Sequence, residues 1–227
     1  MAADLPEDPA APFVILDVTR LLSRLGRGPL TGIDRVEAAW LSHLQGRPHL
    51  LLARIRGRQM LLPVEAGALL LRWAAGVLDD LPPPGLILRL RGRVDARARA
   101  GAALSRMAVR RAGPGGAGLE RTALTGAGTE RGVVYLNVGH SNLTAPLWRN
   151  LGWARRVVLI HDTIPLDHPE WTRAGQPAAF RGRLMVALTH ADLILAVSQT
   201  TRADVLRWRA RLGIAPCAPV VAVPIGT

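Results

Sequence analysis

The chain has 227 residues, of which 49% are hydrophobic, so a core of ordinary size can form and disorder from low hydrophobicity is excluded. A single cysteine, Cys217, excludes an intramolecular disulfide and a zinc site built from cysteines. The 29 basic residues are all arginine and exceed the 17 acidic residues, giving a net charge of +12. They run along the whole chain, which argues against a nucleic-acid binder and leaves open a compositional bias or an unspecific attraction to anionic lipid or phosphate.

No targeting signal is predicted. Residues 1–12 are acidic and rich in proline, unlike the basic start of a signal peptide, and we expect them to form a disordered tail. The longest apolar stretch, 64–78, contains Glu65 and Arg72 and is shorter than the roughly 20 residues of a membrane span. We therefore expect a cytoplasmic protein, with peripheral contact at the inner face of an anionic membrane as an open option.

The first elements are a strand, a glycine-rich loop and a helix. The continuous apolar run 13–18 predicts a strand buried on both faces, as in a parallel sheet. The loop 26–32 follows, and Thr31 or Asp34 caps the next helix. The apolar pattern of that helix falls on Ile33, Val36, Ala39, Trp40 and Leu44.

The middle of the chain combines a hairpin, a helix and an arginine-rich stretch. Residues 49–55 predict a strand, 59–62 a returning strand, and 63–78 a helix opened by proline. Between 86 and 112 the chain carries eight arginines with one acidic residue, and glycine-rich segments follow. These arginines scatter around a helical wheel, so we expect 86–131 to be an irregular, solvated insert and not an amphipathic membrane helix.

The second half alternates strands with helices. Strands are predicted at 133–138, 156–161, 192–197 and 220–223, and helices at 142–151, 177–189 and 200–212. The alternation predicts one Rossmann-like domain over 13–227, an α/β fold with a doubly wound parallel sheet and right-handed crossovers. Ligands of such sheets bind beyond the carboxyl ends of the strands.

The glycine-rich loop is the first candidate site. Gly28 and Gly32 allow backbone N–H groups to approach a phosphate at a helix start, and Arg35 is placed to pair with a carboxylate or phosphate. Thr31 and Asp34 complete the set, with Asp34 either capping the helix or accepting a hydroxyl. The spacing matches neither the dinucleotide fingerprint nor a P-loop, so a tight turn without a ligand stays open.

Other candidates follow the strands of the second half. His161 and Asp162 end one predicted strand, and His140 and Asn142 follow the neighbouring one, which indicates a shared polar cleft. Neither histidine has a partner at zinc-ligand spacing, so we expect no metal. Ser198 precedes a helix without the Gly-x-Ser-x-Gly elbow of a hydrolase, which favours a helix N-cap.

Four segments form a recognisable series in chain order. They are Thr-Gly-Ile-Asp-Arg-Val at 31–36, Val-Val-Leu-Ile-His-Asp-Thr-Ile-Pro at 157–165 with Pro169 and Glu170, Ala-Asp-Leu-Ile-Leu-Ala-Val-Ser at 191–198 continuing to Asp204, and Val-Ala-Val-Pro-Ile-Gly at 221–226. Together they resemble the N-terminal, acceptor-side domain of GT-B glycosyltransferases, specifically glycosyltransferase family 4. Nothing is recognised between about 56 and 130.

The resemblance implies half of a GT-B architecture, which transfers a sugar from a nucleotide-sugar to a hydroxyl acceptor with retained anomeric configuration. It places Gly32 near the donor diphosphate and His161 near the transferred sugar. Asp162 and Arg35 are implied either to shape the acceptor pocket or to order the loop. It implies no dedicated metal and no permanently bound cofactor, since the nucleotide-sugar is a co-substrate. The leaving diphosphate is then stabilised by helix N-termini and basic side chains.

The family's second domain, with its Glu-x7-Glu signature, finds no counterpart before Thr227. We therefore expect either a truncated fragment of a transferase or a partner chain that supplies the donor domain. In both cases the substrates are a nucleotide-sugar and a glycan or lipid-linked acceptor, and this chain alone has negligible activity. No nucleic acid is expected as a partner. The alternative is a non-catalytic module that binds a sugar or lipid acceptor, or a partner subunit.

Overall fold

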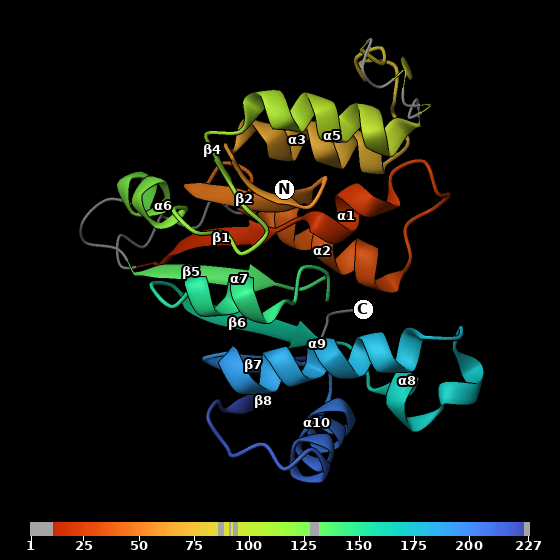
Figure 1. The fold of residues 1–227 in the computed structure, drawn as a ribbon, viewed down its shortest axis with the longest axis vertical. Coiled ribbons are helices and arrows are strands. Elements are labelled where there is room, and N and C mark those ends of the chain that lie inside the picture. Colours follow the sequence, from red (N-terminus) through yellow and green to blue (C-terminus); the bar gives the residue numbers. More distant parts are fainter. Residues whose placement is uncertain (1–10, 86–88, 91, 93–94, 128–131, 225–227) are drawn as a thin grey trace.

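We describe the fold from a computed structural model, in which residues 11–85, 89–90, 92, 95–127 and 132–224 are described. These residues form one eight-stranded sheet with the order β4-β3-β2-β1-β5-β6-β7-β8 (Figure 1). The strands are β1 (Phe13–Asp17), β2 (His49–Ile55), β3 (Arg58–Leu62), β4 (Arg110–Ala112), β5 (Val133–Asn137), β6 (Arg155–Ile160), β7 (Leu193–Ala196) and β8 (Val220–Ala222).

The sheet is parallel except around β3. β3 returns antiparallel to β2 through a tight turn, and β4 pairs antiparallel with β3. In the centre, Leu16 of β1 lies between Leu51 of β2 and Leu136 of β5 in parallel register. All three leucines are buried, as continuous apolar runs in a sheet covered on both faces require. The predicted α/β fold with a doubly wound sheet is therefore confirmed.

Helices cover both faces of the sheet. None of those within the described ranges is long and apolar enough to cross a bilayer. The helices are α1 (Thr19–Arg24), α2 (Gly32–Leu44), α3 (Glu65–Ala74), α5 (Ala96–Met107), α6 (Glu120–Ala127), α7 (Ala145–Asn150), α8 (Ile164–Asp167), the 3-10 turn η1 (Pro169–Trp171), α9 (Gln176–His190) and α10 (Gln199–Arg211).

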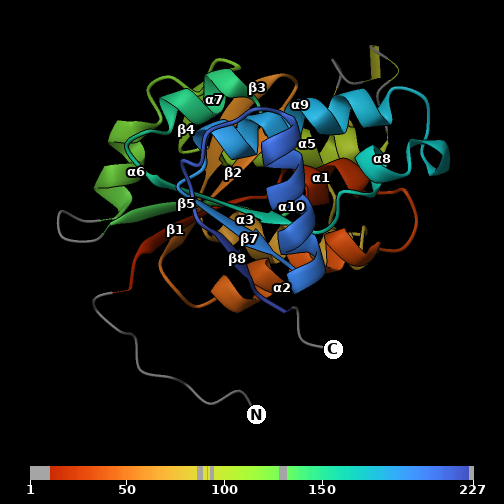
Figure 2. The same cartoon turned by 90° about the horizontal axis from the view of Figure 1, so that it is seen from below.

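Each face has its own hydrophobic core. One core joins the sheet to α6, α7, α9 and α10, with Trp148 and Leu184 at its centre. The other joins it to α1, α2, α3 and α5, with Leu70 and Leu104 fully buried. Figure 2 shows α7 and α9 on one side of the sheet and α2 on the other. This split follows from the order of the strands, because right-handed crossovers running in opposite directions from β1 and β5 place helices on opposite faces.

The stretch 86–131 departs from the prediction of an irregular insert. Its described part forms α5, β4 and α6, and β4 is an edge strand of the sheet. Leu104, Leu119 and Ala123 from this stretch are almost fully buried in the two cores. The predicted tail 1–12 lies outside the described residues except for Ala11 and Pro12, which are exposed.

Helix α2 turns a different face to the core than its apolar pattern predicts. Asp34, Glu37 and Leu41 are fully buried, whereas Val36 and Trp40 are only partly buried. The short helix α1, which the sequence analysis did not predict, lies between β1 and the glycine-rich loop and explains the difference. Its side chains and backbone bind the two carboxylates, so the acidic face of α2 packs inward.

Candidate functional site

The carboxyl ends of the parallel strands meet at one edge of the sheet, on the right of Figure 1. β1 and β5 are neighbours there, but the chain proceeds from β1 toward β2 and from β5 toward β6, in opposite directions. This divergence is the switch point at which open α/β sheets bind their ligands. The predicted candidates follow β5, β6 and β7 or lie where α2 begins, so the fold gathers them along this edge.

His140 and His161 lie side by side, with ring centroids 5.1 Å apart. The Nε2 atom of His140 lies 2.7 Å from the carbonyl oxygen of Leu159, and Nε2 of His161 lies 2.8 Å from that of Val138. A carbonyl only accepts, so each Nε2 carries the proton and donates it. Each ring is therefore fixed by the backbone of the neighbouring strand: His140, which follows β5, is bonded to β6, and His161, which follows β6, is bonded to the residue directly after β5.

Both imidazoles are neutral at pH 7. Burial, and after it the neighbouring His161, lowers the pKa of His140 to about 3. Burial also lowers the pKa of His161, which is 9% exposed. With the proton on Nε2, the Nδ1 atom of His161 keeps its lone pair. It is suited to accept a hydrogen bond from a hydroxyl, whereas its low pKa makes it a poor proton carrier.

Asp162 starts the turn into α8. Its Oδ1 atom accepts a hydrogen bond of 3.1 Å from the backbone N–H of Ile164, which fixes the side chain at the mouth of a cavity of about 500 Å³ between α8 and α10. The lining is rich in hydroxyl and carboxylate groups, which suits a ligand with many hydroxyls. It consists of Asp162, Thr163, Ile164, Asp167, His168, Ser198, Thr200, Thr201, Asp204 and Arg207.

Ser198 is the N-cap of α10. Its Oγ atom accepts from the backbone N–H of Thr201 at 3.0 Å, as the N-cap interpretation predicts. The hydroxyl of Thr201 in turn donates to the carbonyl oxygen of His161 at 3.2 Å. Ser198 therefore lines the cavity and supports the strand end that carries His161, with no base aimed at it among the described residues.

The glycine-rich loop is anchored at its end by Asp34. The carboxylate accepts from the backbone N–H and the hydroxyl of Thr31, at 2.8 and 2.6 Å, and from the Nε atoms of Arg20 and Arg24, at 2.6 and 3.1 Å. Burial alone raises the pKa of Asp34, but the hydrogen bonds from Thr31 and Arg20 outweigh it and lower the pKa. All of this bonding is internal, so Asp34 holds the loop and is not free to accept a substrate hydroxyl.

The outer face of the loop is open. Gly28 and Gly32 have free space where a Cβ atom would be, and Gly28 has the left-handed φ of 86° that favours glycine. Thr31, Gly32 and Arg35 are exposed. Within the described ranges the Arg35 side chain forms neither a hydrogen bond nor an ion pair. The start of α2 thus offers open space at its glycines and an exposed guanidinium one turn into the helix, while the capping box of Thr31 and Asp34 occupies the N–H group of Asp34.

Arg20 connects the loop to the histidine pair, and the sequence analysis missed it. Its Nε atom binds Asp34, while its Cβ atom lies 2.9 Å from where a Cβ of Gly139 would be, next to His140 in the chain. Its positive charge lowers the pKa of both histidines. The loop and His161 therefore lie on the same edge with Arg20 between them, although the cavity beside Asp162 does not extend to Gly32.

A network of buried polar side chains lies behind this edge. Asp17, at the end of β1, accepts from the hydroxyl of Tyr135 and from the amide of Asn142, each at 2.8 Å. Asn142 and Gln59 exchange hydrogen bonds of 2.9 Å. Asn142 is 2% exposed, so it joins β1, β3 and β5 and does not face an acceptor cleft, contrary to the prediction. Burial raises the pKa of Asp17 against the effect of its hydrogen bonds.

Glu37 is a second buried carboxyl that the sequence analysis did not identify. Its Oε1 atom accepts from the backbone N–H of Leu21 at 2.8 Å, whereas Oε2 is buried without a partner among the residues described. Burial foremost, and then the nearby Asp17, raises its pKa well above the ordinary value. Its carboxyl occupies the space of the missing side chain of Gly139, since a Cβ there would lie 1.9 Å from Oε2. The glycine is thus required for this close approach.

Arg183 of α9 adds a positive group beside the histidine pair. Its guanidinium lies over the ring of Phe180, which in turn packs on His140 with ring centroids 6.0 Å apart. Its Nε atom is buried without a hydrogen-bond partner in the described part of the chain. Burial, with the charge of Arg20, lowers its pKa. The edge around His161 therefore combines neutral imidazoles with arginines, an environment that suits an anion.

No group of three or more histidine, cysteine, aspartate or glutamate side chains in the described residues is arranged to hold a metal ion. The comparisons with known proteins found no matching family model, no matching curated protein and no matching solved structure. The class of protein is therefore defined by its fold, an α/β domain with a Rossmann-like doubly wound sheet, and its function is argued from the geometry of the edge.

Proposed function

We propose that this chain is the acceptor-side half of a retaining glycosyltransferase that uses a nucleotide-sugar. The observation that carries the proposal is the neutral imidazole of His161, held at the carboxyl end of β6 and linked through Arg20 to the open start of α2. This arrangement offers a hydrogen-bond acceptor for sugar hydroxyls on one side and positive groups for a diphosphate on the other. We place the protein in the cytoplasm, where its lone Cys217 stays reduced.

In the proposed reaction the bond between the anomeric carbon and the diphosphate oxygen breaks, and the diphosphate leaves with the electron pair. The acceptor hydroxyl oxygen bonds to the anomeric carbon on the same face, and its proton passes to the departing phosphate oxygen. Gly32 and Arg35 are assigned to the leaving diphosphate, where fixed N–H dipoles and positive charge stabilise the developing negative charge. In the proposed enzyme a donor domain grips the nucleotide, while this half binds and orients the sugars.

The remaining side chains position the sugars. The Nδ1 lone pair of His161 accepts from a hydroxyl of the transferred sugar. Asp162 and Ser198 line the hydroxyl-rich cavity that receives the acceptor. The alternative, a non-catalytic module that binds a sugar or lipid acceptor or serves as a partner subunit, is favoured by the same cavity, since its lining suits a glycan without any donor.

The proposal is tested by following the histidine ring signals in NMR spectra while the chain is titrated with UDP-glucose, GDP-mannose and free oligosaccharides. We expect a nucleotide-sugar to shift the His161 signals and the variant His161→Asn to weaken its binding about tenfold, the value of one good hydrogen bond to a charged or polar ligand. The control is His43→Asn, on an exposed position of α2, which leaves binding unchanged.

The outcomes separate the two functions. Shifts at His161 with oligosaccharides alone would favour the binding module and contradict the transferase. Shifts at neither His161 nor His140 with any of these ligands would overturn both proposals.

A further inference from the structure

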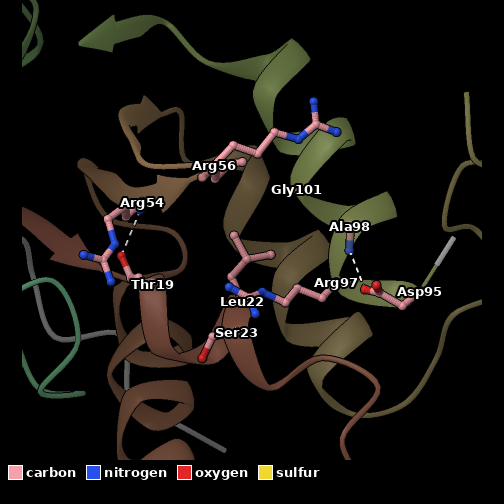
Figure 3. A pocket seen from close by; sticks show the side chains of 10 residues that line it. Thr19, Leu22, Ser23, Arg54, Arg56, Asp95, Arg97, Ala98 and Gly101 are labelled. Atoms are coloured by element: carbon pink, nitrogen blue, oxygen red, sulfur yellow. Dashed lines mark hydrogen bonds between the residues drawn. The ribbon is translucent and has the colours of Figure 1, made fainter. Parts of the chain in front are cut away.

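A second cavity, of about 330 Å³, lies at the carboxyl end of β2, lined by α1 and α5 (Figure 3). None of its lining residues belongs to the histidine pair or to the cavity beside Asp162. The lining consists of Thr19, Leu22, Ser23, Arg54, Ile55, Arg56, Asp95, Arg97, Ala98 and Gly101.

The cavity concentrates positive charge. Three arginines, Arg54, Arg56 and Arg97, stand against one acidic residue, Asp95. Asp95 is already engaged as the N-cap of α5, since its Oδ1 atom accepts from the backbone N–H of Ala98 at 2.8 Å. Like charges around one hollow repel each other, and a bound anion removes that repulsion.

The charge of the three arginines is not neutralised by ion pairs within the described residues. Arg20 and Arg24 bind Asp34, and Arg156 binds Asp192 through both its Nε and its Nη2 atoms. By contrast, the described residues provide no ion pair for the arginines of the cavity. In Figure 3 the side chain of Arg97 extends from α5 toward Leu22, whereas the side chains of Arg54 and Arg56, at the end of β2, point in other directions, so the three guanidinium groups do not meet.

The walls of the cavity are held by the fold. The backbone N–H of Arg54 donates to the hydroxyl of Thr19 at 2.9 Å and fastens the end of β2 to α1. Arg56 has a φ of 52° and Gly57 a φ of 79°, so the turn after β2 has a fixed left-handed form. On the other side, Gly101 allows α5 to approach β2 closely, because a Cβ there would lie 3.3 Å from the side chain of Ile55. The backbone around the cavity is therefore held in place, while the exposed side chains of Arg54, Arg56 and Arg97 are free to turn toward a ligand.

The helix α5 has 12 residues and begins at this cavity, with Asp95 as its N-cap. The carboxylate of Asp95 occupies the N–H group of Ala98 and offsets the positive end of the helix dipole. The preference for an anion therefore depends on the arginines and not on the helix end.

We propose that this cavity binds a phosphate or diphosphate group, with Arg54, Arg56 and Arg97 as its ligands. Guanidinium groups form paired hydrogen bonds with phosphate oxygens, and the volume lies at the lower limit of small-molecule pockets, enough for a phosphate with a small group attached. The site goes beyond the proposed transferase function and stands without it, since it uses none of the same residues.

The test is calorimetric titration of the full chain with inorganic pyrophosphate. We compare the wild type with the triple variant Arg54→Gln, Arg56→Gln and Arg97→Gln, and with a charge-matched triple variant at exposed arginines outside the cavity. We expect the cavity variant to bind about a hundredfold more weakly, the control to bind like the wild type, and binding to weaken as salt is raised. The control replaces Arg121, Arg149 and Arg173 with glutamine.

The source of the phosphate is resolved by a second arm with phosphatidylcholine vesicles that contain phosphatidic acid. Pyrophosphate binding that depends on the cavity arginines supports a soluble phosphate ligand. Vesicle binding that is lost in the cavity variant but retained in the control, without pyrophosphate binding, supports a lipid phosphate. Equal behaviour of the cavity variant and the control in both arms overturns the site.

Two further measurements keep the test decisive. If the triple variant does not fold, the single variant Arg97→Gln replaces it, with an expected loss of about tenfold against Arg173→Gln. The signals of His161 are followed in the same titrations. A failed nucleotide-sugar titration at His161 leaves the cavity result unaffected, so the two proposals fail separately.

Discussion

The residues that shape the edge of the sheet are mostly polar side chains removed from water. Asp17, Asp34, Glu37 and His140 are each less than 10% exposed, although a single sequence predicts such residues at the surface. Hydrogen bonds make this burial tolerable, since the three carboxyl groups accept from the backbone, from arginines or from amides, and His140 donates to a backbone carbonyl. Burial also sets their charge, since it keeps the imidazoles neutral and raises the pKa of Asp17 and Glu37.

The low pKa of His140 predicts a loss of stability in acid. The unfolded imidazole takes up a proton below a pH of 6.5, whereas the folded one stays neutral to about 3, so the unfolded state binds more protons in this window. The free energy of unfolding therefore falls as pH drops, by about 3 kcal/mol between pH 7 and pH 4 from this group. Urea unfolding at a series of pH values measures it.

The variant His140→Asn isolates the contribution, because asparagine also accepts the left-handed φ of 56° at this position but does not titrate. His161 acts in the same direction as His140, while Asp17 and Glu37, with raised pKa values, act in the opposite one. These contributions are the same in wild type and variant, so they cancel when the pH slope of one is subtracted from that of the other. The same pH slope in both proteins would contradict the prediction, and His43→Asn serves as the control.

At the scale of elements, the strands were predictable because each is a short apolar run with turn residues on both sides. The strand β2 was predicted with its observed bounds, and the strands of the second half to within about one residue. The positions of His161, Asp162 and Ser198 at strand ends and at a helix start followed directly from this order. The N-cap role of Ser198 was predictable for the same local reason.

What the sequence could not show depends on contacts between distant residues. Asp17 binds Tyr135 and Asn142, which are 118 and 125 positions away, so nothing near Asp17 in the chain indicates that it is buried. The buried positions of α5 are mostly small, including Ala100 and Gly101, and therefore give a weak apolar pattern among the arginines. The composition of this stretch therefore predicts a solvated linker, although the stretch contains the ordered helices α5 and α6.

The ordered state of this stretch is tested by a pair of leucines. Leu119, 1% exposed, packs in the core next to α6, whereas Leu124 on α6 is 41% exposed. We expect Leu119→Ala to lower the free energy of unfolding by about 2 to 5 kcal/mol, because it opens a cavity, and Leu124→Ala to change it by about 0.5 kcal/mol or less. Urea unfolding measures both, and equal small effects would show that the stretch is not part of the core.

At the scale of the whole molecule, the sheet is shared by both hydrophobic cores and has its switch point in the middle. β1 contributes Phe13 and Ile15 to one core and Leu16 to the other. The network around Asp17 spans β1, β3 and β5 at this point, where the two directions of the strand order meet. The two halves of the sheet therefore cannot separate from each other between β1 and β5 without exposing apolar surface and buried polar groups to water.

This arrangement predicts that both faces unfold in a single cooperative step. Trp73 reports on the core with α3, and Trp148 reports on the core with α7; both are almost fully buried. Fluorotryptophan labelling resolves their signals, and we expect the same urea midpoint for both. In Asp17→Asn the two midpoints should fall together, because the substitution weakens the junction that both cores share. Separate midpoints would mean that the two cores, on the two faces of the sheet, unfold independently of each other.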